Sequence, residues 1–138
     1  MTAEQIYRLR KSFHLLERRA DMAGFYFYEQ LFAMDPGLRP FLQTDIELQG
    51  IKLTGMLGEV LDLLERPIEL GAMLHELGAE HSEYGVQPAQ YATIGTALIS
   101  MLEDVLGADF TLEARQAWVA LYHRVAQAML EGADLAAH

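Results

Sequence analysis

The sequence contains no cysteine. This absence excludes disulfides, thiolate metal ligands, iron–sulfur clusters and a cysteine nucleophile. Basic residues are also scarce, because the only lysines among the 138 residues are Lys11 and Lys52, and the formal net charge is −10. A chain this acidic repels phosphate backbones and anionic lipids, so we expect it to bind neither nucleic acid nor a membrane surface.

Long apolar runs are missing as well. No stretch approaches the roughly 18 to 20 apolar residues that a membrane-spanning helix needs. The first 13 residues carry charges where a secretion signal would have its apolar centre. We therefore expect no membrane span and no secretion, and the lack of cysteine is compatible with a reducing cytoplasm.

Proline is rare, and three of the four prolines, Pro36, Pro67 and Pro88, stand where helical patterns begin. Apolar residues recur with the helical period along the whole chain, and no segment alternates with period two, so the chain is predicted to be all-α. The predicted helices begin at the capping residue Thr2, at about 21–34, 35–42 and 45–64, at Pro67, at Pro88 and after the capping residue Thr111.

We find no internal repeat and no linker, which indicates a single domain over residues 1–138. Long helices interrupted by a short third one favour an irregular helical sandwich over a four-helix bundle. Such a sandwich can leave room for a flat cofactor between helices.

Four polar residues occupy positions on apolar helix faces: Tyr28, Gln49, His81 and Tyr91. Tyr28 and Tyr91 can each be a core tyrosine with a paired hydroxyl, and Gln49 can be a half-solvated residue near a helix end. Alternatively, Tyr28 and Gln49 donate hydrogen bonds to a bound diatomic ligand, and Tyr91 supports a metal ligand from behind.

His81 lies in phase with Leu74 and Leu77, so it faces inward. Taken alone, it is more simply explained as a core histidine paired with a backbone carbonyl. A zinc site usually needs four ligands, and no second histidine has the required spacing. Haem needs a single histidine, because the porphyrin supplies the other four nitrogens.

Four segments together resemble one family. FYEQLFAMDPGLRPFL (27–42), LQGIKL (48–53), LGAEHSEYGVQPAQYATIG (77–95) and AWVALY (117–122) are similar to segments of bacterial haemoglobins and of the globin domain of flavohaemoglobins. The resemblance implies a globin fold, a helical sandwich around a haem pocket, for the whole chain.

The resemblance also implies a site. His81 would be the proximal ligand of haem b, with Tyr28 and Gln49 as the distal hydrogen-bonding pair and Leu53 as the apolar wall beside them. Lys52 stands where the family often has a cation near a haem propionate, and Tyr91 matches the proximal tyrosine. The pocket positions implied by the resemblance are Phe41, Leu42, Lys52, Leu77, Tyr84, Val86, Tyr91 and Ile94.

The sequence departs from the family at two positions. Leu42 aligns with a phenylalanine that packs on the haem, and Phe41 precedes it, so either residue can take that role. Ala133 aligns with the glutamate that flavohaemoglobins place near the proximal histidine, and Glu131 lies roughly 200° away round the helix. A less anionic proximal histidine disfavours peroxidase-like chemistry.

The leading hypothesis is reversible binding of O2, and also of NO and CO, at ferrous haem, for oxygen transport or storage. An alternative is NO dioxygenation with an external reductase, since the sequence has no GxGxxG element and no reductase domain is expected. Gas sensing through a partner protein and a haem-free structural globin are further alternatives, and the chain is expected to be a monomer or a homodimer.

Overall fold

The computed structural model describes residues 1–41 and 45–137, and the regular structure within these ranges is entirely helical. This confirms the all-α prediction. The elements are α1 (Ala3–Glu17), α2 (Ala20–Met34), the 3₁₀-helix η1 (Pro36–Phe41), α3 (Ile46–Asp62), α4 (Pro67–Glu83), α5 (Gln90–Leu106), the 3₁₀-helix η2 (Gly107–Asp109) and α6 (Leu112–Ala137). No helix in the described ranges has both the length and the apolar character needed to cross a membrane.

Local capping explains where several helices begin. At α1, the Gln5 amide donates to Thr2 Oγ1 at 3.1 Å and the Thr2 amide donates to Gln5 Oε1 at 3.0 Å, which forms the predicted capping box. At α6, the Ala114 amide donates to Thr111 Oγ1 at 3.2 Å. Pro67 is the first residue of α4, as predicted.

The predicted start of the sixth helix at Pro88 is two residues too early. The Gln90 and Tyr91 amides donate to the carbonyls of Gln87 and Pro88, each three residues back, at 2.9 and 3.2 Å. These bonds form a tight turn, so Pro88 lies in the turn that leads into α5.

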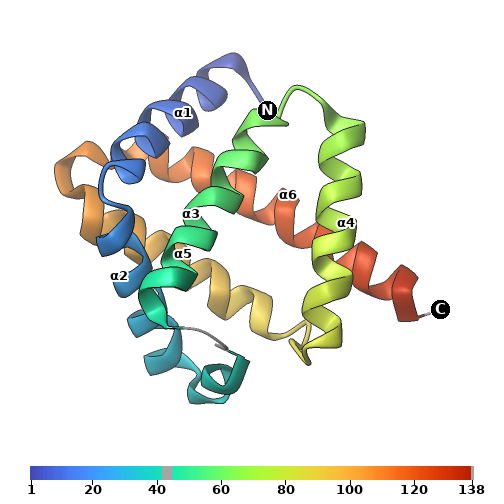
Figure 1. The fold of residues 1–138 in the computed structure, drawn as a ribbon. Coiled ribbons are helices and arrows are strands. Elements are labelled where there is room, and N and C mark those ends of the chain that lie inside the picture. Colours follow the sequence, from blue (N-terminus) through green and yellow to red (C-terminus); the bar gives the residue numbers. More distant parts are fainter. Residues whose placement is uncertain (42–44, 138) are drawn as a thin grey trace.

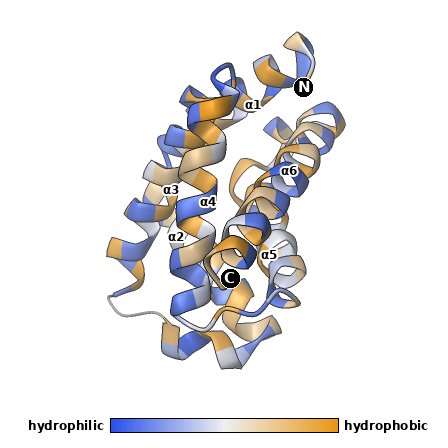
Figure 2. Cartoon of the chain, turned by 90° about the vertical axis from the view of Figure 1, so that its right-hand side faces the viewer, coloured by the Kyte–Doolittle hydropathy of each residue, from blue (hydrophilic) through white to orange (hydrophobic). Residues whose placement is uncertain are grey.

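The helices form two layers. In Figure 1, α6 crosses behind α3 and α4. Figure 2 turns the molecule edge-on and shows α3 and α4 on one side, with α5 and α6 on the other. The two neighbouring helices α3 and α4 have different main partners, because α3 packs on α2 whereas α4 packs on α6.

Glycines allow these helix pairs to approach closely. A Cβ atom built on Gly50 of α3 would lie 2.7 Å from the Cα atom of Gly24 in α2, so the two backbones touch. In the same way, Gly78 of α4 lies against the backbone of Met129, and Gly132 of α6 lies against the backbone of His75. The positions of α3 and α4 therefore depend on residues without side chains.

The contact at Gly24 also corrects the predicted inner face of α2. The apolar spacing of residues 21–34 predicts an inner face formed by Phe25, Tyr28, Leu31 and Phe32, but Phe25 is 54% exposed. Leu31 is buried as predicted. Because Gly24 faces α3, the helix is rotated so that Ala23 and Phe27 are buried with Leu31 in place of Phe25.

The Gly24–Gly50 contact can be tested with a matched pair of alanine substitutions. Gly24→Ala is expected to lower the free energy of unfolding by about 1–3 kcal/mol or more, because the new methyl group overlaps the α3 backbone. Gly55→Ala on α3 meets no atom within 4 Å and is expected to raise the stability by up to about 1 kcal/mol. Urea unfolding followed by circular dichroism measures both, and equal stability of the two variants would contradict the account.

Candidate functional site

The imidazole of His81 is held by its own helix. Its Nδ1 atom lies 2.8 Å from the backbone carbonyl oxygen of Leu77, one turn earlier in α4. A carbonyl oxygen can only accept, so Nδ1 carries the proton and donates it. In the neutral form of the ring, the lone pair is then on Nε2, which is the form in which histidine binds a metal.

The turn that follows His81 is fixed by a glycine. Gly85 has a φ angle of +98°, a left-handed conformation that favours glycine. The Val86 amide donates to the carbonyl of His81, and the Gly85 amide donates to that of Ser82, both at 3.0 Å, which is the Schellman pattern of helix ends. Both the ring and the backbone carbonyl of His81 are therefore hydrogen-bonded.

The other predicted residues of this segment differ in exposure. Leu77 and Val86 are partly buried and pack against the core, whereas the side chain of Tyr84 is 61% exposed.

Tyr28 of α2 provides a protonated hydroxyl. Its ring packs edge-on against Phe27, with ring centroids 4.9 Å apart, and against Phe32 at 5.8 Å. Burial raises the pKa of Tyr28 to about 12, so the hydroxyl keeps its proton at neutral pH. Within residues 1–41 and 45–137 this hydroxyl forms no hydrogen bond, so it can donate to a ligand.

The three predicted residues of α3 lie near its beginning. Gln49 is half-buried and precedes Gly50, the residue that touches α2 one turn before Tyr28. Leu53 is partly buried and packs against the core, while Lys52 is exposed. Tyr28 and Gln49 therefore lie on the two helices that meet at the glycine contact.

Tyr91 of α5 is 6% exposed, and burial raises its pKa. Its backbone carbonyl accepts a hydrogen bond of 2.7 Å from the hydroxyl of Tyr122, whose ring lies against Gly95. Ile94, on the same helix, is partly buried against the core.

Glu131 does not replace the carboxylate that the family resemblance implies near the proximal histidine. Glu131 Oε2 lies 3.3 Å from Nε2 of His75, a different histidine of α4. The acceptor for His81 is thus a neutral carbonyl and not a carboxylate.

Phe41 is the last residue of η1 and is 36% exposed. Its ring lies against Gly85, because a Cβ atom built on that glycine would be 3.4 Å from Phe41 Cε1. This contact brings the end of η1 to the turn that follows His81. Leu42 lies outside the described residues.

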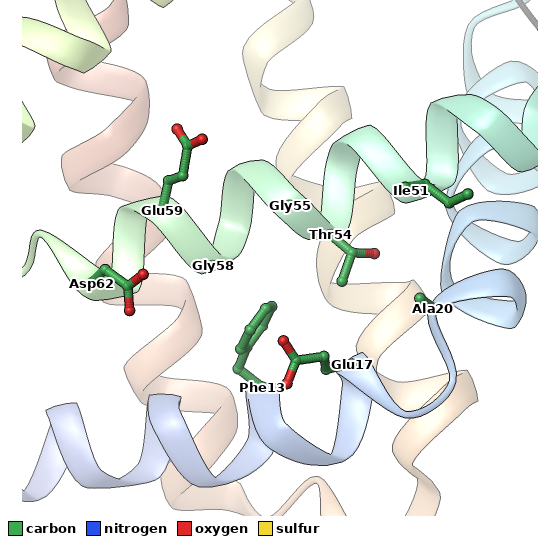
Figure 3. A pocket seen from close by; sticks show the side chains of 9 residues that line it. All are labelled: Phe13, Glu17, Ala20, Ile51, Thr54, Gly55, Gly58, Glu59 and Asp62. Atoms are coloured by element: carbon green, nitrogen blue, oxygen red, sulfur yellow. The ribbon is translucent and has the colours of Figure 1, made fainter.

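A separate hollow of about 290 Å³ lies between α1 and α3, as Figure 3 shows. Its lining includes Phe13 and three carboxylates, Glu17, Glu59 and Asp62, and none of the predicted site residues. Among the described residues, no group of three or more histidines and acidic residues could hold a metal ion. We assign no function to this hollow.

Sequence reasoning missed three supports of the site. These are the glycine turn at Gly85, the hydrogen bond from Tyr122 to the Tyr91 carbonyl, and a hydrogen bond between Asp35 and Gln90. Only the first left a signal, since a glycine shortly after a helical pattern often ends a helix. The other two join residues that are distant in sequence and have no spacing pattern.

A model of the globin family matches residues 27–129, which is more than half of the 138 residues. A flavohemoprotein of Rhizobium meliloti (strain 1021) is 28% identical over 104 residues, covering 73% of this chain and 26% of that protein. A flavohemoprotein of Vibrio cholerae is 22% identical over 134 residues, covering 95% of this chain and 34% of that protein. The chain thus spans about a quarter to a third of these relatives.

Two solved structures share the fold. A hexacoordinated heme protein from an anhydrobiotic tardigrade superimposes with a TM-score of 0.85 at 18% identity, covering 97% of this chain and 96% of its own. An engineered carbene transferase, built on a nitric oxide dioxygenase candidate of Rhodothermus marinus, also gives a TM-score of 0.85, at 23% identity over 98% of this chain and 94% of its own. The fold and the family model agree, and the chain belongs to the globin family.

Proposed function

We propose that this globin binds haem b through Nε2 of His81 and reversibly binds O2, as well as NO and CO, for oxygen transport or storage. Membership of the globin family supports haem and gas binding in general. The observation that carries the proposal is the 2.8 Å hydrogen bond from His81 Nδ1 to the Leu77 carbonyl. That bond restrains the ring and, in the neutral form of the imidazole, directs the lone pair of Nε2 away from the helix backbone, as a metal ligand requires.

The residues present suit haem better than a bare metal ion. His81 offers a single imidazole, and the described residues hold no metal-binding group of three or more histidines and acidic residues. The haem supplies four more nitrogens and an iron atom that can bind a diatomic gas. Leu77, Val86 and Ile94, which pack at the edge of the core, offer apolar surface to a porphyrin.

The distal residues determine how strongly a gas is held. The Tyr28 hydroxyl is protonated at neutral pH, and the Gln49 side chain also carries a donor. Hydrogen bonds are stronger in an apolar surrounding such as Leu53 provides, so these two donors would favour a polarised ligand such as O2. We therefore expect slow release of O2.

His81→Ala is expected to abolish the native axial ligation and to change the absorption spectrum of the ferrous protein, with partial recovery when imidazole is added. The matched control is His75→Ala, because His75 lies on the same helix and pairs with Glu131. This control is expected to keep the spectrum of the unaltered protein. An unchanged five-coordinate ferrous spectrum in His81→Ala would refute the assignment.

Tyr28→Phe is expected to raise the O2 dissociation rate roughly 10- to 100-fold, since a hydrogen bond to a charged or strongly polarised group contributes about 1.5–3 kcal/mol. Stopped-flow displacement of O2 by CO measures the rate. Tyr26→Phe, two residues earlier on α2, removes a hydroxyl from a side chain outside the predicted site and should leave the rate unchanged. Equal rates in the Tyr28 variant and the unaltered protein would exclude the proposed role.

A second candidate function is NO dioxygenation, favoured by the similarity to flavohemoproteins. The reaction NO + O2 + e⁻ → NO₃⁻ balances only if an electron is supplied, so an external flavin-dependent reductase is part of this proposal. We expect sustained NO consumption with stoichiometric nitrate only when such a reductase and nicotinamide are added. A single turnover with every reductase tried would leave gas binding as the function.

The cytoplasmic location and the monomeric or dimeric state remain predictions.

A further inference from the structure

A hydrogen bond joins two segments that are 55 residues apart. Gln90 Nε2, at the start of α5, donates to Oδ2 of Asp35 at 3.1 Å. The other carboxylate oxygen, Oδ1, accepts from the Gly37 amide at 3.0 Å and so caps η1. Asp35 thus uses one oxygen to start η1 and the other to hold α5.

The amide of Gln90 is also engaged at both of its ends. Its Oε1 atom accepts from the Gln87 amide at 2.8 Å, and the side chain of Gln87 donates to the Gly85 carbonyl at 3.2 Å. Consecutive hydrogen bonds therefore lead from Asp35 through Gln90 and Gln87 to Gly85. Gly85 is the residue whose left-handed conformation ends the helix of His81.

A second contact joins the same two segments independently. The ring of Phe41, the last residue of η1, lies against Gly85. The contact from the residue before η1 reaches the first residue of α5, and the contact from the end of η1 reaches Gly85 in the turn that precedes α5.

These contacts connect the two sides of the proposed haem site. Asp35 follows α2, which carries Tyr28, and the turn at residues 84–89 follows α4, which carries His81. Helix α3 packs mainly on α2, whereas α4 packs mainly on α6. The contacts of Asp35 and Phe41 therefore join the α2–α3 side of the proposed site to its α4 side.

We propose that the hydrogen bond between Asp35 and Gln90, called the clasp below, positions the turn after His81 and slows the loss of haem. Both are positioning residues, because they act through the backbone of the turn. The inference rests on the proposed binding of haem by His81.

Gln90→Glu breaks the clasp selectively. The new carboxylate can still accept from the Gln87 amide, but it places an oxygen where Nε2 donated and so repels Asp35. We expect the rate of haem transfer to an excess of an apo-globin acceptor to rise. The expected rise is roughly 5- to 30-fold, the factor that corresponds to the loss of one or two hydrogen bonds. The iron–histidine stretching band of the ferrous protein should also shift.

Combining Asp35→Asn with Gln90→Glu should restore the clasp with donor and acceptor exchanged. The asparagine keeps an oxygen for the Gly37 amide and gains a donor for the glutamate, and the total charge of the pair is unchanged. The haem-transfer rate and the stretching band are expected to return close to those of the unaltered protein.

Gln30→Glu is the matched control. Gln30 Nε2 donates to Oδ2 of Asp104 at 3.0 Å, a bond of the same kind between α2 and α5 that does not involve the turn. It adds the same charge and the same repulsion, and we expect little change in haem transfer or in the stretching band.

The outcomes separate the two proposals. If the unaltered protein takes up no haem, the proposed function fails and the clasp fails with it. If haem binds but Gln90→Glu behaves like Gln30→Glu, or the double variant stays as fast as the single one, only the clasp is overturned. Should Gln90→Glu not fold, a double variant that folds and retains haem normally supports the exchange of donor and acceptor, and a double variant that loses haem rapidly contradicts it.

Discussion

The placement of helices α3 and α4 depends on close backbone contact at glycines. Gly24 and Gly50 bring α2 and α3 into contact, and Gly78 and Gly132 do the same for α4 and α6. Helix α3 carries Gln49 and packs on α2, and helix α4 carries His81 and packs on α6. A flat cofactor needs such an arrangement, because two helices that packed fully on each other would fill the space with their own side chains.

The two sides of the predicted site differ in their hydrogen-bonding groups. The partner of His81 is the neutral carbonyl of Leu77, and Glu131, two residues from the position that aligns with the family's glutamate, contacts His75. An imidazole without an anionic partner donates less electron density to a metal. On the opposite side, burial keeps the Tyr28 hydroxyl protonated, so that it remains a donor. Both features agree with the proposed binding of an uncharged gas.

Local features were predictable from the sequence, and features set by tertiary contact were not. The helices and the capping box at Thr2 follow from spacing within one segment. The predicted burial of Phe25 was wrong, because the rotation of α2 is set by the contact of Gly24 with α3. The Asp35–Gln90 bond was missed, since it joins two surface-type residues that no periodicity relates. The assignment of His81 to haem came from the family resemblance and not from the pattern alone.

Binding of haem through His81 can be tested by the absorption spectrum of the purified protein. The spectrum would be recorded as isolated and after haem titration, then with dithionite, and finally with CO. The account predicts a Soret band that saturates at one haem per chain, shifts on reduction and shifts again with CO. A protein that is folded but shows no Soret band after haem titration would contradict it.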